Sequence, residues 1–249
     1  MTRRNWRVHH PELPDAGGGR IELSAEESHH VQRVLRLRPG DPLTVFDGQG
    51  HEWSAVIEAA ARGSVRVRLE SPLDNRVEPE LELVLCQALC PPARMEWLIQ
   101  KVTEVGVSAV VVFGAARSGS SSATPRLLGR WRRIALEAAK QSGRTRVPRI
   151  ESCARLPSPP AERGLGLLLD PAEDVPPIGG LLPPSPPRAV WLAVGPEGGF
   201  ELREIELLTG EGWQRARLGP RTLRADTAGL VAAAILLHRW GDLGPGAAV

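Results

Sequence analysis

The chain has 249 residues, 42% of them hydrophobic and 24% charged, a composition typical of folded globular proteins and not of disordered ones. It contains no apolar run of about 18 residues, so we expect no membrane-spanning helix. The N-terminus also lacks the apolar stretch of a signal peptide. Three cysteines, Cys86, Cys90 and Cys153, are too few for a disulfide framework and favour a reducing compartment. We therefore expect a cytoplasmic protein.

The formal net charge is only +2, so the overall charge identifies no partner. The distribution of charge is more informative. The stretch from Arg117 to Arg149 contains nine basic residues and a single acid, Glu137. Such clustering indicates a nucleic-acid surface more strongly than arginine content alone does.

Residues 1–72 have the pattern of a small β-rich unit. Short runs with partial alternation, separated by glycine-containing turns, predict strands over 21–23, 42–47, 52–58 and 64–69. One helix interrupts them, with Ser24 as its N-cap and Glu27 three residues later. Its apolar stripe consists of His30, Val31, Val34 and Leu35. Residues 73–80, which combine a proline with mixed charge, predict a linker.

From residue 81 onward, apolar runs alternate with helical patterns. The runs predict strands over 81–89, 107–113, 165–169, 189–194 and 214–218. The helical patterns cover 95–105, 124–143, 202–208 and 226–240, and the second opens with Thr124 and Pro125 as N-cap and first residue. This alternation predicts an α/β domain over 81–249 with a mostly parallel sheet. The proline-rich segment 156–187 predicts a surface excursion.

Several common sites are missing from the sequence. No G-x-G-x-x-G follows a predicted strand, and neither a P-loop nor a G-x-S-x-G elbow is present. Cys86 and Cys90 have no companion pair, and the two adjacent histidine pairs lack metal-ligand spacing. We therefore expect no metal site.

Two glycine-rich loops each follow a predicted strand, one over 195–200 and the other over 218–228. Ligands of α/β proteins bind at the carboxyl ends of parallel strands. Neither loop carries the lysine and hydroxyl that bind phosphate and magnesium, so their backbone groups suit a neutral hydrogen-bonding group such as an adenine. The alternative is two tight turns without a ligand.

Five blocks of the sequence, 30–41, 95–107, 137–148, 195–200 and 218–228, resemble the RsmE family of 16S rRNA uridine N3-methyltransferases, of the SPOUT class. The blocks follow the family's order over nearly the whole chain. Two places depart from its pattern. Residues 90–94 replace a basic residue and a glycine, and Ala116 precedes Arg117 where the family usually has Glu-Arg.

The resemblance implies a fold and a set of partners. It implies an α/β fold whose C-terminal SPOUT methyltransferase domain is a trefoil knot with a mostly parallel sheet, preceded by a PUA-like β-barrel that binds RNA. It further implies S-adenosylmethionine as cofactor, 16S rRNA within the small ribosomal subunit as partner, and a homodimer away from any membrane. The last predicted helix is apolar on several faces, with Leu230, Val231, Ile235, Leu236 and Leu237, as a dimer contact requires.

The resemblance also assigns roles to individual residues. The cofactor-binding candidates are Leu169, Asp170, Val194, Gly195, Glu197, Gly198, Gly199, Leu218, Gly219, Pro220, Leu223 and Arg224. Arg224 is the candidate that stabilises charge on the uracil, and Glu197 the one that accepts the N3 proton or orients the base. The alternatives are a helix cap for Glu197 and a loop-stapling ion pair for Arg224.

The RNA-binding candidates are basic or polar residues of the matching blocks and their surroundings: Arg7, Arg33, Arg36, Arg38, Lys101, Arg117, Gln141, Arg144 and Arg146. For the arginines of the small domain, a solvated helix face is the alternative. Two other functions stay open. One is a non-catalytic RNA-binding or ribosome-assembly protein of the same fold, against which the intact glycine loops argue. The other is a SPOUT methyltransferase acting on tRNA.

Overall fold

The computed structural model describes residues 6–14, 18–118, 122–159 and 164–244. The chain forms two compact units. The first combines Met1–Glu78 with Ala139–Val147, and the second combines Pro79–Ala138 with Pro148–Val249. The boundaries expected from the sequence, at 72 and 81, follow the order of the chain and do not include the return of residues 139–147 to the first unit.

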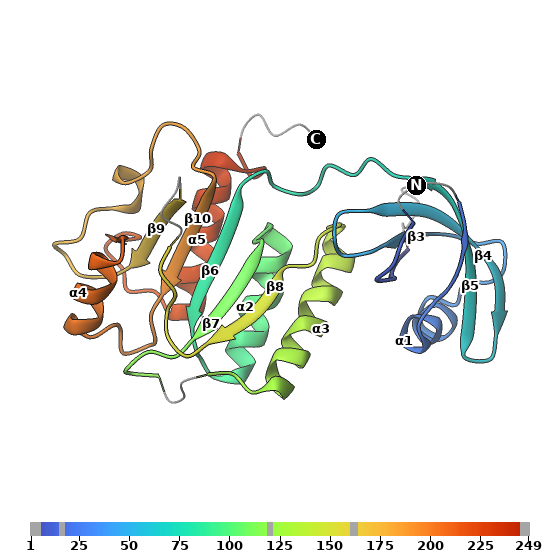
Figure 1. Ribbon diagram of the computed structural model, residues 1–249, viewed down its shortest axis with the longest axis horizontal. Helices are drawn as coiled ribbons and strands as arrows, with labels where there is room; N and C mark the ends of the chain where they lie inside the picture. Colours follow the sequence, from blue (N-terminus) through green and yellow to red (C-terminus); the bar gives the residue numbers. More distant parts are fainter. Residues whose placement is uncertain (1–5, 15–17, 119–121, 160–163, 245–249) are drawn as a thin grey trace. The chain divides into compact units, whose positions relative to one another are not determined.

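The first unit is built on a five-stranded sheet with the order β1-β3-β4-β5-β2 (Figure 1). Its strands are β1 (Arg7–His9), β2 (Arg20–Glu22), β3 (Pro42–Phe46), β4 (Glu52–Ala61) and β5 (Ser64–Pro72). Only β1 and β3 pair in parallel. Alternation in β5 buries Val65, Val67 and Leu69 in the core and leaves Arg66 and Arg68 exposed. All four predicted strands form, whereas the three-residue β1 was not predicted.

The predicted helix of the first unit begins as expected but does not continue as a regular α-helix. Ser24 caps α1 (Ala25–His29), and its Oγ accepts a hydrogen bond from the Glu27 amide at 3.2 Å. From His30 to Leu35 the backbone continues as a π-helix, η1, which ends at Arg36 in the left-handed region with φ 57°. The wider turn breaks the expected apolar stripe, because Val31 is fully buried and Val34 is 61% exposed.

Residues 139–147 are bound to the first unit largely through Glu78. This carboxylate accepts hydrogen bonds from Nη2 of Arg144 at 2.7 Å, and from the amides of Thr145 and Arg146 at 2.8 Å each. The side chains of Arg144 and Glu78 are only 5% and 14% exposed. A carboxylate that receives three donors in this setting fixes the conformation of the segment that supplies them.

A hydrogen bond from Arg7 and an ion pair of Lys140 also join the same segment to the N-terminal residues. Arg7 pairs with Glu52 and donates from Nη2 to the carbonyl oxygen of Arg144 at 2.8 Å. Lys140 Nζ lies 2.8 Å from the Glu27 carboxylate, and both side chains are 8% exposed. Among its described residues the first unit therefore contains buried ion pairs between residues far apart in sequence: Arg7 with Glu52, Lys140 with Glu27, and Arg144 with Glu78.

The second unit is built on a six-stranded sheet, parallel throughout, with the order β11-β9-β10-β6-β7-β8 (Figure 1). Its strands are β6 (Glu82–Ala88), β7 (Ala109–Phe113), β8 (Arg149–Cys153), β9 (Gly164–Leu169), β10 (Ala189–Val194) and β11 (Trp213–Ala216). The predicted parallel sheet is confirmed. The strand β8 was not predicted; it is short, lies at the edge of the sheet and has Ile150 as its one buried residue.

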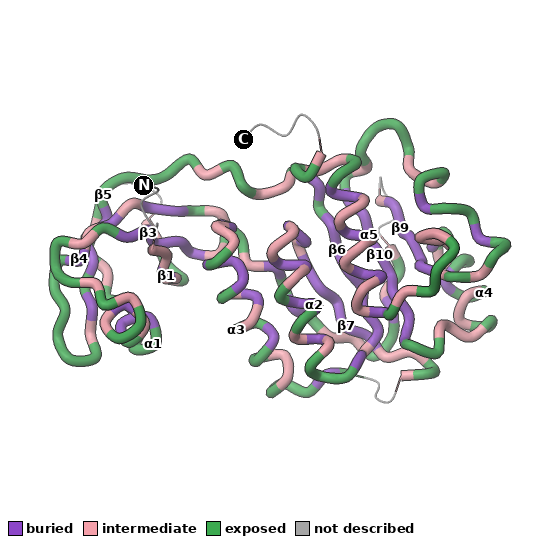
Figure 2. Tube along the Cα trace, turned by 180° about the vertical axis from the view of Figure 1, so that it is seen from behind, coloured by how far each residue is buried: buried purple, intermediate pink, exposed green. Residues whose placement is uncertain are grey.

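Helices cover the sheet on both faces. The helices are α2 (Pro92–Val105), α3 (Pro125–Ser142), α4 (Leu202–Gly210) and α5 (Ala225–Trp240). Helix α5 packs on α2 and against β6 and β10, and the strands between the layers are buried (Figure 2). A Cβ on Gly229 of α5 would lie 3.1 Å from Oε1 of Gln87, so this helix approaches β6 closely. On the other face, Leu208 of α4 joins an apolar cluster with Phe113, Leu168 and Trp213.

The proline-rich excursion makes a defined contact beside the sheet. It contains the short 3-10 helix η2 (Ile178–Gly180). The amide of Ile178 donates to the carbonyl oxygen of Arg217 at 2.9 Å, and the amide of Arg217 donates to that of Pro176 at 2.9 Å. The excursion is thereby paired with the segment that follows β11. In the part of the chain that the structure describes, no helix is both long and apolar enough to cross a lipid bilayer.

We predict that Glu78→Ala lowers the free energy of unfolding by about 3 kcal/mol, because it removes the carboxylate that accepts from the buried Arg144 guanidinium and from two backbone amides. Chemical denaturation of the full chain measures this loss. The matched control is Glu70→Ala, which removes an exposed ion pair with Arg68 and should cost less than about 1 kcal/mol. Equal losses in the two variants would contradict the role given to Glu78.

Candidate active site

A cavity of about 700 Å³ opens at the carboxyl edge of the parallel sheet, where β9, β10 and β11 end. Its walls come from three segments of the second unit: residues 169–172 after β9, residues 194–200 after β10, and residues 216–225 after β11. A cavity of this size falls within the range of small-molecule sites. The two glycine-rich loops therefore meet in space, as the parallel sheet predicts.

Most of the residues predicted to bind a cofactor line this cavity. They are Leu169, Asp170, Val194, Gly195, Glu197, Gly199, Leu218, Gly219, Leu223 and Arg224. Among the described residues, Gly198 and Pro220 are the two candidates that do not line it. Sequence reasoning missed Arg94, Phe200 and Thr222, which also line the cavity. Arg94 belongs to a helix about 100 residues earlier, and no spacing in the sequence connects it with the loops.

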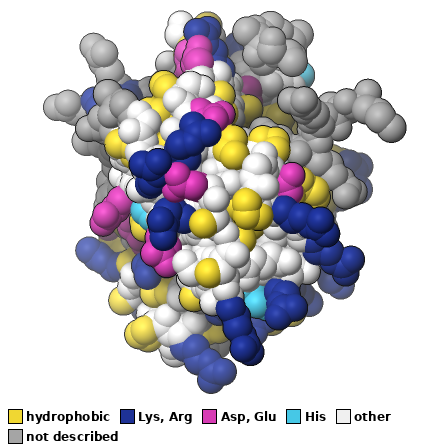
Figure 3. All heavy atoms as spheres, turned by 90° about the vertical axis from the view of Figure 1, so that its right-hand side faces the viewer, with side chains coloured by type: hydrophobic (Ala, Val, Ile, Leu, Met, Phe, Trp, Pro, Cys, Tyr) yellow, Lys and Arg dark blue, Asp and Glu magenta, His cyan; other side chains and the backbone are white. Residues whose placement is uncertain are grey.

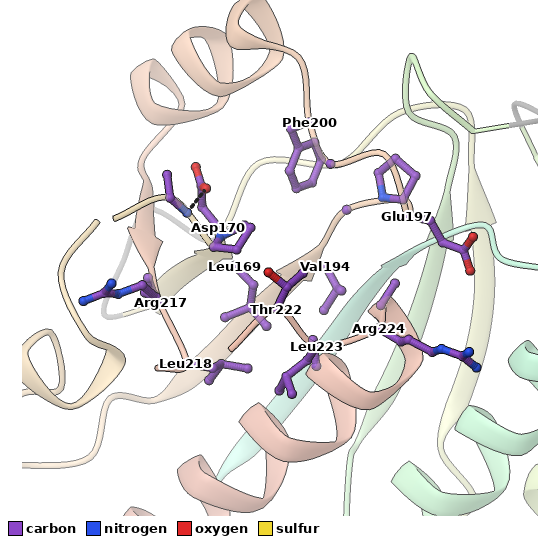
Figure 4. A pocket seen from close by; sticks show the side chains of 18 of the residues that line it. Leu169, Asp170, Val194, Glu197, Phe200, Arg217, Leu218, Thr222, Leu223 and Arg224 are labelled. Atoms are coloured by element: carbon purple, nitrogen blue, oxygen red, sulfur yellow. Dashed lines mark hydrogen bonds between the residues drawn. The ribbon is translucent and has the colours of Figure 1, made fainter. Parts of the chain in front are cut away.

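The middle of the cavity is apolar. Figure 4 shows the side chains of Leu169, Val194, Leu218 and Leu223 gathered there, with Thr222 beside them. Branched apolar side chains next to glycine-rich backbone can hold a flat ring between them while main-chain groups bond to its edge. This surface fits a group such as an adenine, the class of ligand that the loops indicated.

Glycine is required at two places in these loops. A Cβ on Gly195 would lie 2.9 Å from the ring of Phe200, which stacks on Phe113 with centroids 6.2 Å apart. Gly219 has φ 128°, a conformation that residues with a side chain rarely adopt. Both loops therefore depend on glycine for their course around the cavity.

The carboxylate of Asp170 accepts hydrogen bonds from two other residues of the protein. Its Oδ2 accepts from Nε of Arg215 at 2.9 Å, and its Oδ1 accepts from the amide of Ala172 at 3.0 Å, the bond drawn in Figure 4. Arg215 also pairs with Asp174 at 3.3 Å. Asp170 thus stabilises the cavity wall between β9 and β11.

The two predicted catalytic side chains lie on one side of the cavity. Figure 4 shows the charged ends of Glu197 and Arg224 directed away from the apolar middle, to the same side. Glu197 pairs with Arg94. It does not cap α4, because Glu201 is the N-cap and forms a capping box with Glu204, so the cap alternative for Glu197 is wrong. Within the described residues the Arg224 side chain forms no ion pair, so the stapling alternative has no partner there.

Arg117, predicted to bind RNA, contacts the first glycine loop. Its Nη1 donates to the carbonyl oxygen of Gly198 at 2.6 Å, and a Cβ on Gly198 would lie 3.1 Å from Arg117 Cδ. The neighbouring Ala116 amide donates to Glu204 at 2.9 Å. The segment after β7 therefore holds the loop after β10 through one hydrogen bond and the first turn of α4 through another.

The other RNA-binding candidates divide into two groups. Arg7 and Arg144 lie in buried ion pairs, which is a correction to their expected place on an RNA-binding surface. Burial lowers the pKa of the Arg7 guanidinium, although Glu52 and Glu78 oppose the shift. Lys101 is bound to Glu104 at 2.8 Å.

The exposed group consists of Arg33, Arg36, Arg38, Gln141 and Arg146. All five belong to the first unit. Figure 3 shows one face of the molecule, over which Lys and Arg side chains are spread with acidic side chains between several of them.

Cys86 and Cys90 are buried, and Cys153 is partly buried. Burial raises the pKa of the Cys86, Cys90 and Cys153 thiols, so they are mostly protonated at neutral pH. Within the described ranges, no three His, Cys, Asp or Glu side chains are grouped so that they could hold a metal ion.

Comparisons with known proteins agree over nearly the whole chain. A family model described as an RNA methyltransferase domain matches residues 77–237, and one described as an RNA methyltransferase PUA domain matches residues 23–70. The ribosomal RNA small subunit methyltransferase E of Mycobacterium bovis is 33% identical over 241 residues, which cover 92% of this chain and 90% of that protein. Its counterpart from Synechocystis is 34% identical, covering 86% of this chain and 71% of that protein.

Two solved structures are similar over their full length. A methyltransferase from Legionella pneumophila, solved with its cofactor SAM bound, has a TM-score of 0.86 and 33% identity, covering 96% of this chain and 100% of that one. A ribosomal RNA small subunit methyltransferase E from Neisseria gonorrhoeae, bound to S-adenosyl methionine, has a TM-score of 0.85 and 29% identity, covering 96% and 99%.

We predict that Arg117→Ala loosens the first glycine loop, because it removes the hydrogen bond to the Gly198 carbonyl. Amide hydrogen exchange over residues 195–199 should become several-fold faster, as measured by mass spectrometry. Arg203→Ala, which changes an exposed arginine of α4, is the matched control and should leave this exchange as it is. Identical exchange in both variants would contradict the anchoring role of Arg117.

Proposed function

The chain belongs to the family of ribosomal RNA small subunit methyltransferases E, and from this premise we propose that it methylates N3 of a uridine in 16S rRNA with S-adenosylmethionine as the methyl donor. The observation that carries the proposal is the cavity between the two glycine loops, which has an apolar middle and the charged pair Glu197 and Arg224 on one side. We propose that the chain acts in the cytoplasm, where its proposed substrate is found.

The residues of the cavity fit the proposed cofactor. Leu169, Val194, Leu218 and Leu223 would hold its adenine ring, and the backbone of residues 195–199 and 218–224 would bind its polar edges. When bound, this cofactor supplies a methyl group on a positively charged sulfur. No metal takes part in the proposed reaction, and we expect calorimetric titration to give the same cofactor affinity with and without EDTA.

The protein's part in the reaction concerns the acceptor base. The carbon–sulfur bond breaks as the bond from carbon to N3 forms, and N3 must lose its proton. We assign Glu197 to hold the base through this N–H and to accept the proton. Arg224 donates to a uracil carbonyl oxygen and stabilises the negative charge that spreads over the ring as the proton leaves.

RNA contacts outside the cavity are proposed for the exposed candidates, Arg33, Arg36, Arg38, Gln141 and Arg146. Arg36 follows a π-helix and has a left-handed backbone, a combination often found at functional sites. The proposed partner is 16S rRNA within the assembled small ribosomal subunit. We also propose that the second unit forms the trefoil knot that the family resemblance implies.

A homodimer through α5 is part of the proposal. Leu236 and Leu237 are fully buried within the subunit, whereas Leu230, Val231 and Ile235 are half-buried on the outer side of this apolar helix. A second copy would cover these three side chains. Light scattering over a range of concentrations tests the dimer, and a constant monomer mass would contradict it.

The function is tested by nucleoside mass spectrometry of 16S rRNA from a strain that lacks the gene. We expect N3-methyluridine to disappear and to return when the gene is restored. Loss of a methylated nucleoside from tRNA, with 16S rRNA unchanged, would contradict the proposed substrate. Failure of calorimetry to detect S-adenosylmethionine binding would contradict the enzymatic function.

We predict that Arg224→Ala lowers the methylation rate by about 10² to 10³-fold while the cofactor affinity stays within a few-fold. The reason is that an interaction made mainly in the transition state affects turnover more than binding. Arg224→Lys should recover only part of the rate, because an ammonium lacks the planar pair of donors. Single-turnover assays and calorimetry separate the two quantities. Lost cofactor binding with unchanged turnover at saturation would make Arg224 a structural residue.

A further inference from the structure

Arg94 is the one charged side chain that reaches the cavity from outside the segments after β9, β10 and β11, among the residues described as lining it. It stands in the first turn of α2, and its side chain is 34% exposed. Its guanidinium pairs with the carboxylate of Glu197, which belongs to the loop after β10. The pair therefore joins helix α2 to the glycine-rich loop after β10.

Residues near Glu197 other than Arg94 form few contacts that could hold its carboxylate in place. Its side chain is 57% exposed, and the residues on both sides of it are Pro196 and Gly198. The charged residues nearby have other partners. Glu201 and Glu204 form the capping box of α4, and Glu204 also accepts from the Ala116 amide. Arg117 donates to the Gly198 carbonyl oxygen. In the described chain, Arg94 is thus the side chain that holds the Glu197 carboxylate.

We propose that Arg94 is a positioning residue for methyl transfer, which acts by holding the carboxylate of Glu197 in the orientation that meets the acceptor base. This inference rests on the proposed function. A guanidinium can fix a carboxylate through two parallel donors, and this restricts a side chain that would otherwise rotate freely. Because Arg94 acts through Glu197, it needs no contact with the reacting atoms.

This role predicts a specific pattern of kinetics. A carboxylate that loses its support is misplaced in most turnovers, and misplacement of a reacting group by about 1 Å can cost about 10²-fold in rate. We therefore expect Arg94→Ala to lower kcat by about 10 to 10²-fold. KM for RNA and the Kd of the cofactor should remain within a few-fold, because the apolar middle of the cavity is unchanged.

A double-mutant cycle tests the coupling between the two residues. Once Glu197→Gln has removed the charged group that Arg94 holds, Arg94→Ala should cause no further loss of kcat. In the chain that keeps Glu197, Arg94→Lys should have a higher kcat than Arg94→Ala. In the chain that carries Glu197→Gln, Arg94→Lys and Arg94→Ala should have the same kcat. Arg203→Ala, on the exposed side of α4, is the control and should have the rate of the unmodified chain. Losses that simply multiply would overturn the proposal.

A second readout needs neither cofactor nor activity. Carboxyl labelling with a water-soluble carbodiimide and an amine, followed by peptide mass spectrometry, measures how readily the Glu197 carboxylate reacts. A carboxylate that is paired with Arg94 should react more slowly than an unpaired one. We expect Arg94→Ala to raise labelling of Glu197 several-fold, while labelling of the exposed Glu206 stays constant as the internal reference. Unchanged labelling of Glu197 would overturn the proposal. Increased labelling in a protein that methylates no RNA would support the contact and contradict only the proposed function.

Discussion

The parallel pairing of β9 with both β10 and β11 is the constraint on which the candidate site depends. Parallel strands place their carboxyl ends at one edge of a sheet, so the segments after Leu169, Val194 and Ala216 must emerge side by side. The segments after Val194 and Ala216 then bend around the cavity, with glycine where the backbone approaches Phe200 or takes a positive φ. A change in the order of these strands would separate the two loops, even if each loop kept its own conformation.

Several basic side chains of this chain are used within the protein. The basic stretch from Arg117 to Arg149 suggested a surface for nucleic acid. In the structure, some of its basic side chains bind other parts of the protein instead. Arg117 holds the first glycine loop, and Lys140 and Arg144 lie in buried ion pairs. Burying a charge is costly unless a partner and hydrogen bonds compensate it, and Glu27 and Glu78 supply these here. The side chains that remain for RNA are fewer than the sequence suggested.

The charged side chains on one side of the cavity differ in the partners that they bind. Glu201 and Glu204 complete the cap of α4, which leaves Glu197 without a role in the helix. Arg94 reaches Glu197 from α2, and Arg224 stays without an ion pair in the described chain. One carboxylate that is held and one guanidinium that is unpaired face the same side of the cavity (Figure 4). This arrangement suits an acceptor that gives up a proton and gains negative charge.

Local patterns in the amino-acid sequence were enough to predict the secondary structure and the chemistry of the loops. Apolar runs, the Ser24 cap, the Thr124-Pro125 helix start and the two glycine loops are signals read within a few residues. The predicted strands and helices formed, except that the helix after Ser24 continues as a π-helix from His30. The contacts between distant residues became visible only in the folded chain. They are the return of residues 139–147 to the first unit, the burial of Arg7 and Arg144, and the pairing of Arg94 with Glu197. The physical reason is that propensity and periodicity act over one or two turns of chain. An ion pair forms only where the folded chain brings the two charges together, at whatever separation in sequence.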